Sequence, residues 1–158
     1  MADLETLRVK LAPVVEFART LDPAETDDAK AKLDERFPLS GDAMVALRAL
    51  VREGIDAGWL ADREAGGVRF SRVRKAEGLD DVSVDVVHMN QAGPGHTHPN
   101  GEMDLCFTVS GDARFDRQPE GWTVYGPGSW HVPTVTGGVM DILYFLPGGA
   151  IRFESEPK

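Results

Sequence analysis

The chain has 158 residues with 42% hydrophobic and 27% charged residues, the length and composition of one globular domain. Its 17 basic and 26 acidic residues give a net charge of −9, so we expect no nucleic-acid partner. No apolar run approaches the roughly 20 residues of a membrane span, and the N-terminus does not resemble a signal peptide. A single cysteine, Cys106, excludes an internal disulfide framework, and together these features predict a cytoplasmic protein without a membrane partner.

The first part of the chain, residues 1–62, predicts three helices. Apolar residues recur at steps of three and four over residues 4–18, which is typical of an amphipathic helix. Asp22 followed by Pro23 is a typical helix start, with a capping side chain before a proline at the first helical position. A third helix is expected from Ser40 to about Trp59. We expect this part to pack on the rest of the chain.

The second part, residues 63–158, predicts strands. Eleven of the 17 glycines, seven of the ten prolines and all four histidines follow Asp81. Short strands separated by Gly/Pro turns are typical of a β-sandwich or small barrel, and their segregation from the helices argues against a doubly wound sheet. The predicted strands are 68–75, 83–91, 102–110, 113–117, 122–125, 139–146 and 151–154.

Three histidines and a glutamate predict a metal site. On an extended segment, residues two apart point to one face, so His96 and His98 project together. The following Pro-Asn-Gly turn brings Glu102 back near both rings, and His131, after a Gly-Pro-Gly turn, offers a fourth ligand. This ligand set suits a divalent transition metal, Fe, Mn, Zn, Co or Ni. The alternative is that these are unrelated surface histidines beside a turn.

Two short motifs, His96-x-His98-x-x-x-Glu102 and Gly128-x-x-His131, resemble the metal-binding motifs of the cupin superfamily. Longer stretches resemble the 4-hydroxylaminobenzoate lyase family within it; they are residues 88–106, 121–138 and 143–151. The resemblance implies a cupin-type antiparallel β-barrel (a double-stranded β-helix) preceded by about three α-helices, with a metal inside. It also implies a lyase that converts 4-hydroxylaminobenzoate to 3,4-dihydroxybenzoate and ammonia during bacterial breakdown of nitroaromatic compounds.

Strand alternation predicts which side chains face the barrel interior. If Glu102 points inward, Asp104 and Cys106 share its face. An apolar row then points outward and must be covered by the helices or by a second subunit, which favours a homodimer. In the alternative, the apolar side is the interior and Asp104 is solvated. The outward row consists of Met103, Leu105, Phe107 and Val109.

Further side chains are candidates for catalysis and for binding a small aromatic acid. Glu102 and Asp104 are the carboxylates best placed for proton transfer. Three aromatic residues offer a stacking surface for a ring, although aromatic strand residues belong to the core as often. They are Trp122, Tyr125 and Trp130. A substrate carboxylate requires an arginine, and we predict Arg114 for this role. The same chemistry is available at Arg69, Arg72, Arg74, Arg117 and Arg152.

Two other functions remain open from the sequence. A centre of two histidines and one carboxylate also suits an iron-dependent dioxygenase, or an isomerase, of a small acid. A cupin that binds its ligand without turnover is the third possibility.

Overall fold

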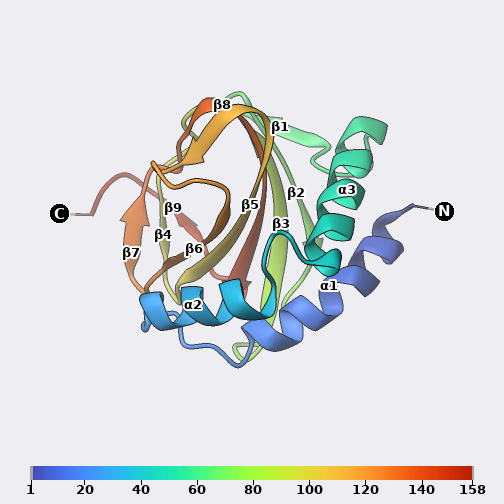
Figure 1. Cartoon of the computed structure of the whole chain (residues 1–158). Helices are drawn as coiled ribbons and strands as arrows, with labels where there is room; N and C mark the ends of the chain where they lie inside the picture. The colour runs from blue at the N-terminus through green and yellow to red at the C-terminus, as the bar shows by residue number, and fades with distance from the viewer. Residues whose placement is uncertain (1, 158) are drawn as a thin grey trace.

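The computed structural model describes residues 2–157, and three helices precede nine strands in this range (Figure 1). The helices are α1 (Leu4–Ala18), α2 (Thr26–Arg36) and α3 (Asp42–Ala57). The strands are β1 (Arg63–Ala65), β2 (Val68–Arg74), β3 (Val82–Met89), β4 (His96–His98), β5 (Glu102–Phe115), β6 (Gly121–Tyr125), β7 (Ser129–His131), β8 (Val135–Pro147) and β9 (Arg152–Phe153). No helix in the described range has the length and apolar character needed to cross a membrane.

The helix boundaries follow from local side-chain chemistry. Asp3 caps α1, because its carboxylate accepts a hydrogen bond from the backbone N–H of Thr6 at 2.8 Å. The prediction that α2 starts at Asp22 is wrong: this carboxylate accepts from the backbone N–H of Ala24 at 3.0 Å, and the helix begins later. Gly58 ends α3 with φ +87°, a left-handed conformation that glycine adopts without strain.

The strands form two antiparallel sheets that face each other. The larger sheet has the order β1-β2-β3-β8-β5-β6, and the smaller has the order β7-β4-β9. In Figure 1, α1 and α3 lie along the outside of the larger sheet, whereas α2 lies beside β6. The predicted helices followed by an antiparallel barrel are therefore confirmed.

The predicted strands 102–110 and 113–117 are one continuous strand, β5. Gly111 does not end β5, because the strand continues through register shifts beside residues 137–138 of β8. A Cβ at Gly111, where φ is +73°, would lie only 2.4 Å from the carbonyl oxygen of Gly137. Glycine is therefore required for a close approach of two backbones, and the apparent turn signal marks an irregularity inside a long hairpin.

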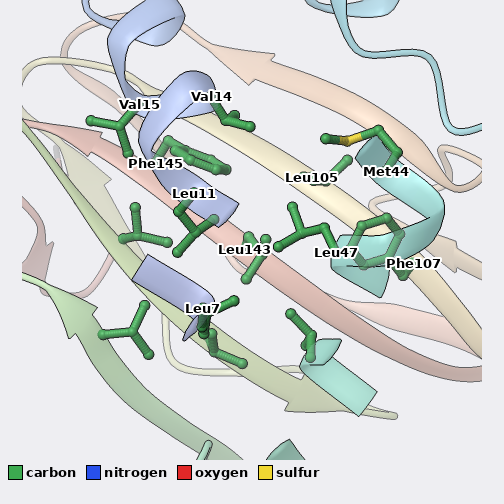
Figure 2. Close-up of a cluster of buried hydrophobic side chains, with 14 of the residues drawn as sticks. Leu7, Leu11, Val14, Val15, Met44, Leu47, Leu105, Phe107, Leu143 and Phe145 are labelled. Carbon is green, nitrogen blue, oxygen red and sulfur yellow. The ribbon is translucent and has the colours of Figure 1, made fainter. Parts of the chain in front are cut away.

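The outer face of the large sheet packs on the helices, as strand alternation predicts. Met103, Leu105 and Phe107 of β5 are buried in a cluster with side chains from α1 and α3 (Figure 2). Its members in Figure 2 include Leu7, Leu11, Val14, Val15, Met44, Leu47, Leu143 and Phe145. Val109 is 39% exposed and is not covered by the helices. The helices cover the rest of the row, so its burial does not require a second subunit. The homodimer and the domain division at residue 62 stay predictions.

The inner face of the same strands forms a second cluster inside the barrel. Cys106 and Ile142 are fully buried there, on the opposite side from the helices. Glu102 and Asp104 share this inner face and are also fully buried. The alternative in which Asp104 is solvated is therefore wrong.

Candidate metal centre

Three strands, two from the smaller sheet and one from the larger, bring the predicted ligands together. His96 and His98 lie on β4, and His131 lies directly opposite His96 on β7. Glu102 opens β5 after a turn at Gly101, where φ is +89° and a Cβ would lie 2.5 Å from Pro23. One ligand atom from each of the four residues lies within 4.8 Å of the others. The predicted group is therefore assembled in the structure.

The ligand atoms converge on one buried point. Oε2 of Glu102 lies 2.6 Å from Nε2 of His98, 3.6 Å from Nε2 of His131 and 3.7 Å from Nε2 of His96. The Nε2 atoms of His96 and His131 are 3.1 Å apart. The His131 side chain is the most exposed of the four, at 13%.

Each histidine turns its other ring nitrogen away from this point. All three Nδ1 atoms contact an oxygen outside the cluster, so all three Nε2 atoms face the cluster. The Nδ1 partners are Asp116 Oδ2 for His131 (2.5 Å), Ser129 Oγ for His98 (2.8 Å) and the Pro94 carbonyl for His96 (3.3 Å). This is the arrangement in which metal-binding histidines are held in proteins.

The buried polar atoms of the cluster fit a cation. Neither carboxylate oxygen of Glu102, nor Nε2 of His98, has a partner of hydrogen-bond geometry among residues 2–157. A buried carboxylate without hydrogen bonds is costly, and a cation among these nitrogens and oxygens removes that cost. The donor set of three imidazoles and one carboxylate suits a divalent transition metal.

The charges in the cluster influence one another strongly. Burial favours a higher pKa for Glu102, but its contacts with the three histidines outweigh burial and hold the pKa well below its usual range. Burial also acts to lower the pKa of His131, but Asp116 and Glu102 outweigh it and raise the pKa to about 9. The two carboxylates therefore favour the charged form of the His131 imidazole.

Asp104 supplies a second buried carboxyl group beside the cluster. It lies two residues after Glu102 on the inner face, and neither of its oxygens has a hydrogen-bond partner among the described residues. Burial, followed by the negative charge of Glu102, raises the pKa of Asp104 well above its usual range. This carboxyl group can therefore hold a proton next to the ligand set.

Asp104 belongs to a row of polar residues that crosses the inner face of the large sheet, which we call the polar row. Its members are direct neighbours in strand register: Arg72, Asp85, Tyr144, Asp104 and Thr123. Arg72 donates two hydrogen bonds to Asp85, at 2.7 and 3.2 Å. The Tyr144 ring lies 6.3 Å from that of His96, so the row extends from the ion pair to the histidine cluster.

A cavity of about 420 Å³ opens beside the histidine cluster. His96 is the cluster member that lines it, and Tyr144 of the polar row lines it as well. The remaining wall is mostly apolar and contains three charged residues. The apolar lining is Ala65, Val68, Phe70, Val87, Met89, Pro94, Pro133, Ile151 and Phe153, and the charged residues are Arg63, Arg72 and Asp85. The cavity can therefore take a small, mainly apolar molecule with one end at His96.

Of the predicted aromatic residues, Tyr125 lies against the histidine cluster. Its ring stacks on His98 with 5.3 Å between centroids and lies 4.3 Å from the ring of His131. The Tyr125 hydroxyl donates a hydrogen bond to Asp116. Tyr125 therefore packs against the histidine rings and does not line the cavity.

The structure places Trp122, Trp130 and Arg114 away from the cluster and outside the cavity lining, so it gives no support to their predicted role in substrate binding. Trp122 faces the helices, is 2% exposed and donates from Nε1 to the carbonyl of Phe37 at 3.0 Å. Trp130 alternates with the inward-facing His131 and donates from Nε1 to the carbonyl of Glu154 at 2.9 Å, outside the cluster. Arg114 is exposed, because it lies between two β5 residues that face the interior.

Several residues of the site were missed from the sequence: Arg63, Asp85, Asp116, Ser129 and Tyr144. Ser129 could have been found by alternation, because it lies two residues before His131 on the same face. Asp116 lies in a turn 15 residues before His131, and no local pattern joins the two.

The comparisons with known proteins identify the family of this chain. The sequence profile of the 4-hydroxylaminobenzoate lyase family matches residues 12–153. The chain belongs to this family. It is similar to a 4-hydroxylaminobenzoate lyase of Nocardioides sp. (strain LMS-CY), with 29% identity over 143 residues that cover 83% of this chain and 84% of the relative. A 4-hydroxylaminobenzoate lyase of Pseudomonas putida is 26% identical over 161 residues, covering 90% of this chain and 92% of the relative.

Membership of the 4-hydroxylaminobenzoate lyase family makes the chain a lyase, as predicted. The predicted architecture, three helices followed by an antiparallel β-barrel, is also confirmed by the structure. Among solved structures, an RmlC-like cupin protein of Ralstonia eutropha JMP134 matches with a TM-score of 0.40 and 14% identity. That match covers 53% of this chain and 58% of the cupin.

Proposed function

We propose that the protein is a metal-dependent cytoplasmic lyase that converts 4-hydroxylaminobenzoate, or a related hydroxylamino-aromatic acid, to 3,4-dihydroxybenzoate and ammonia in nitroaromatic breakdown. One observation carries the proposal: the four-residue ligand cluster reaches, through His96, a cavity whose wall is mostly apolar. The names of its relatives support the substrate. The cytoplasmic location fits the single buried cysteine.

The overall reaction balances without an external oxidant. The N–O bond breaks and its hydroxyl group leaves as water. One water oxygen bonds to the ring carbon next to the nitrogen-bearing carbon, and a second water oxygen replaces the nitrogen, which leaves as ammonia. The sum is one water consumed for each ammonia released, so the enzyme must mainly move protons and stabilise a leaving hydroxyl group.

The residues of the site divide these tasks. His96, His98, Glu102 and His131 would hold the metal, which when bound supplies Lewis-acid activation of the N–OH oxygen. Asp104 holds a proton on its buried carboxyl group beside the cluster and can donate it as the N–O bond breaks. The apolar wall of the cavity would pack against the aromatic ring.

An anaerobic assay tests the proposal. The purified protein, with its metal content measured by elemental analysis, is incubated with 4-hydroxylaminobenzoate without oxygen. We expect 3,4-dihydroxybenzoate and ammonia in equal amounts, loss of activity on chelation, and recovery when a divalent metal is restored. Turnover that requires oxygen would instead support the dioxygenase alternative, and tight binding without turnover would support a non-catalytic cupin.

A further inference from the structure

The cavity beside the metal cluster contains one cation without an ionic partner. Arg72 is paired with Asp85 by two hydrogen bonds, so this pair contributes no net charge. Arg63 also lines the cavity, but within residues 2–157 its side chain makes no hydrogen bond or ion pair. Asp85 is the only carboxylate in the lining of this cavity, and it is already paired with Arg72. Arg63 therefore leaves the cavity with an unbalanced positive charge.

Strand register places Arg63 on the cavity side of the sheet. It lies directly opposite Phe70, whose side chain packs with the inner cluster of the barrel. Paired residues of adjacent strands share a face, so Arg63 extends the inner face at the open edge of the large sheet. Phe70 pairs with Val87, and Val87 pairs with Ile142 of β8. Arg63 thus begins a row that continues as apolar residues.

This row provides a binding surface of the length of a small aromatic acid. Three strand spacings, roughly 14 Å between Cα atoms, separate Arg63 from Ile142. The long Arg63 side chain can cover part of that distance, and Phe70 and Val87 form an apolar floor for a ring over the remainder. His96, on the opposing small sheet, lines the same cavity. One end of the cavity is therefore cationic, the middle is apolar, and the ligand cluster adjoins it.

We propose that Arg63 binds the carboxylate of an aromatic acid and so determines which hydroxylamino-aromatic compounds the enzyme accepts. This inference rests on the proposed function for the identity of the reaction. Arginine binds carboxylates through two parallel hydrogen bonds, and only an arginine without a competing protein carboxylate is free to do so. The net charge of the whole chain is −9, so an unpaired cationic side chain in the cavity offsets a field that disfavours anions.

Binding of two inert probes to the metal-loaded protein tests this role. 4-Nitrobenzoate carries the carboxylate and nitrobenzene lacks it, and both dissociation constants are measured by calorimetry. For R63Q we expect the affinity for 4-nitrobenzoate to fall about 10- to 100-fold and the affinity for nitrobenzene to stay within about twofold. R63K should retain part of the preference. R114Q, which removes an exposed arginine outside the cavity, is the matched control and should bind both probes as the wild type does.

The outcomes separate this inference from the proposed function. Unchanged binding of 4-nitrobenzoate by R63Q, or an equal loss of both probes, overturns the role of Arg63 even if the wild type converts 4-hydroxylaminobenzoate. Loss of the carboxylate preference in R63Q supports the role even if the wild type has no lyase activity, in which case the proposed function fails alone. If the wild type turns over substrate, kcat/KM of R63Q should fall because KM rises. Melting temperature and metal content should remain those of the wild type, because the Arg63 side chain is exposed and makes no bond to lose.

Discussion

Nδ1 of His131 lies 2.5 Å from Oδ2 of Asp116, and this contact sets the direction of the imidazole ring. The Asp116 carboxylate is itself fixed, because Oδ1 accepts from the backbone N–H of Thr134 at 2.9 Å and Oδ2 accepts from the Tyr125 hydroxyl. As a result, Nε2 of His131 faces Glu102. Asp116, which the sequence analysis did not identify, thus orients His131, the predicted metal ligand on β7.

Replacing Asp116 by asparagine should weaken metal binding. The variant loses the negative charge that strengthens the His131 imidazole as a metal ligand. Residues that hydrogen-bond to a metal ligand in this way typically contribute 10- to 100-fold to metal affinity. Competition with a chelator measures the change. D112N, which alters an exposed carboxylate of the same hairpin, serves as the control and should bind metal normally. Equal affinities for D116N and the wild type would show that the contact is irrelevant to the metal.

Replacing His98 by alanine should remove metal and activity together. His98 is completely buried and contributes one of four ligand atoms, so we expect metal content below about one tenth of the wild type. Circular dichroism should show that the secondary structure is retained. H88A offers a comparison, because this histidine contacts Asp141 and not the cluster. Full metal stoichiometry in H98A would refute the ligand assignment.

Replacing Asp104 by asparagine should lower kcat by about 100-fold or more while metal content stays near that of the wild type. Asparagine has nearly the same shape, but it cannot release a proton from a carboxyl group. Steady-state kinetics and elemental analysis of one preparation separate these effects. A D104N enzyme with normal kcat would assign the proton transfer to another group.

Asp81 should make the stability depend on pH in the acid range. Burial favours a higher pKa for Asp81, but the backbone N–H groups of Glu77 and Val82 and the Arg74 guanidinium outweigh it and lower the pKa. A lowered pKa stabilises the fold above the ordinary carboxyl pKa of 3.8, and this stabilisation is lost as the pH falls through the lowered value.

The variant D81N should therefore lower the free energy of unfolding by about 1–3 kcal/mol at pH 7. The difference from the wild type should shrink as the pH falls below about 4, which urea titrations across this range would measure. D80N changes the adjacent, exposed carboxylate and should show no such difference. A constant difference at every pH would mean that D81N acts through packing instead of charge.

Residues 63–158 expressed alone should aggregate or lose cooperative unfolding. Without α1 and α3, the outer row of Met103, Leu105 and Phe107 would face water. Burial of each such side chain contributes about 1.5–3 kcal/mol, so removing the cover removes much of the stability. Size-exclusion chromatography and urea unfolding provide the measurement, with the full chain as the reference. A monomeric, metal-loaded and fully active 63–158 fragment would contradict the prediction.

The ligand cluster could be predicted because its pattern is local. His96 and His98 are two residues apart on an extended segment, and Glu102 follows one tight turn, so alternation and turn chemistry suffice. The two faces of β5 could be assigned for the same reason, once Glu102 was placed inside. Three strands (β1, β4 and β7) have only three residues each, which is too short for periodicity to reveal them.

Which residues line the cavity depends on long-range strand register, which cannot be derived from the local sequence pattern. Trp122 pairs with Leu105, and that pairing turns its ring toward the helices. Arg63 reaches the cavity only because β1 adds to the edge of β2, whereas Arg114 of β5 faces solvent. An arginine or a tryptophan has the right chemistry on either face, so only the folded topology can choose among them.

The two-sided use of β5 has a consequence for how this enzyme can change over evolutionary time. Glu102 and Asp104 lie on the inner face with the ligand cluster, whereas Met103 and Leu105 pack on the helices outside the sheet. Substitutions on the inner face can therefore alter chemistry or ligand preference while the helix-packing surface stays intact. A lineage could acquire a new aromatic substrate through inner-face changes alone, without first acquiring stabilising mutations in the helices.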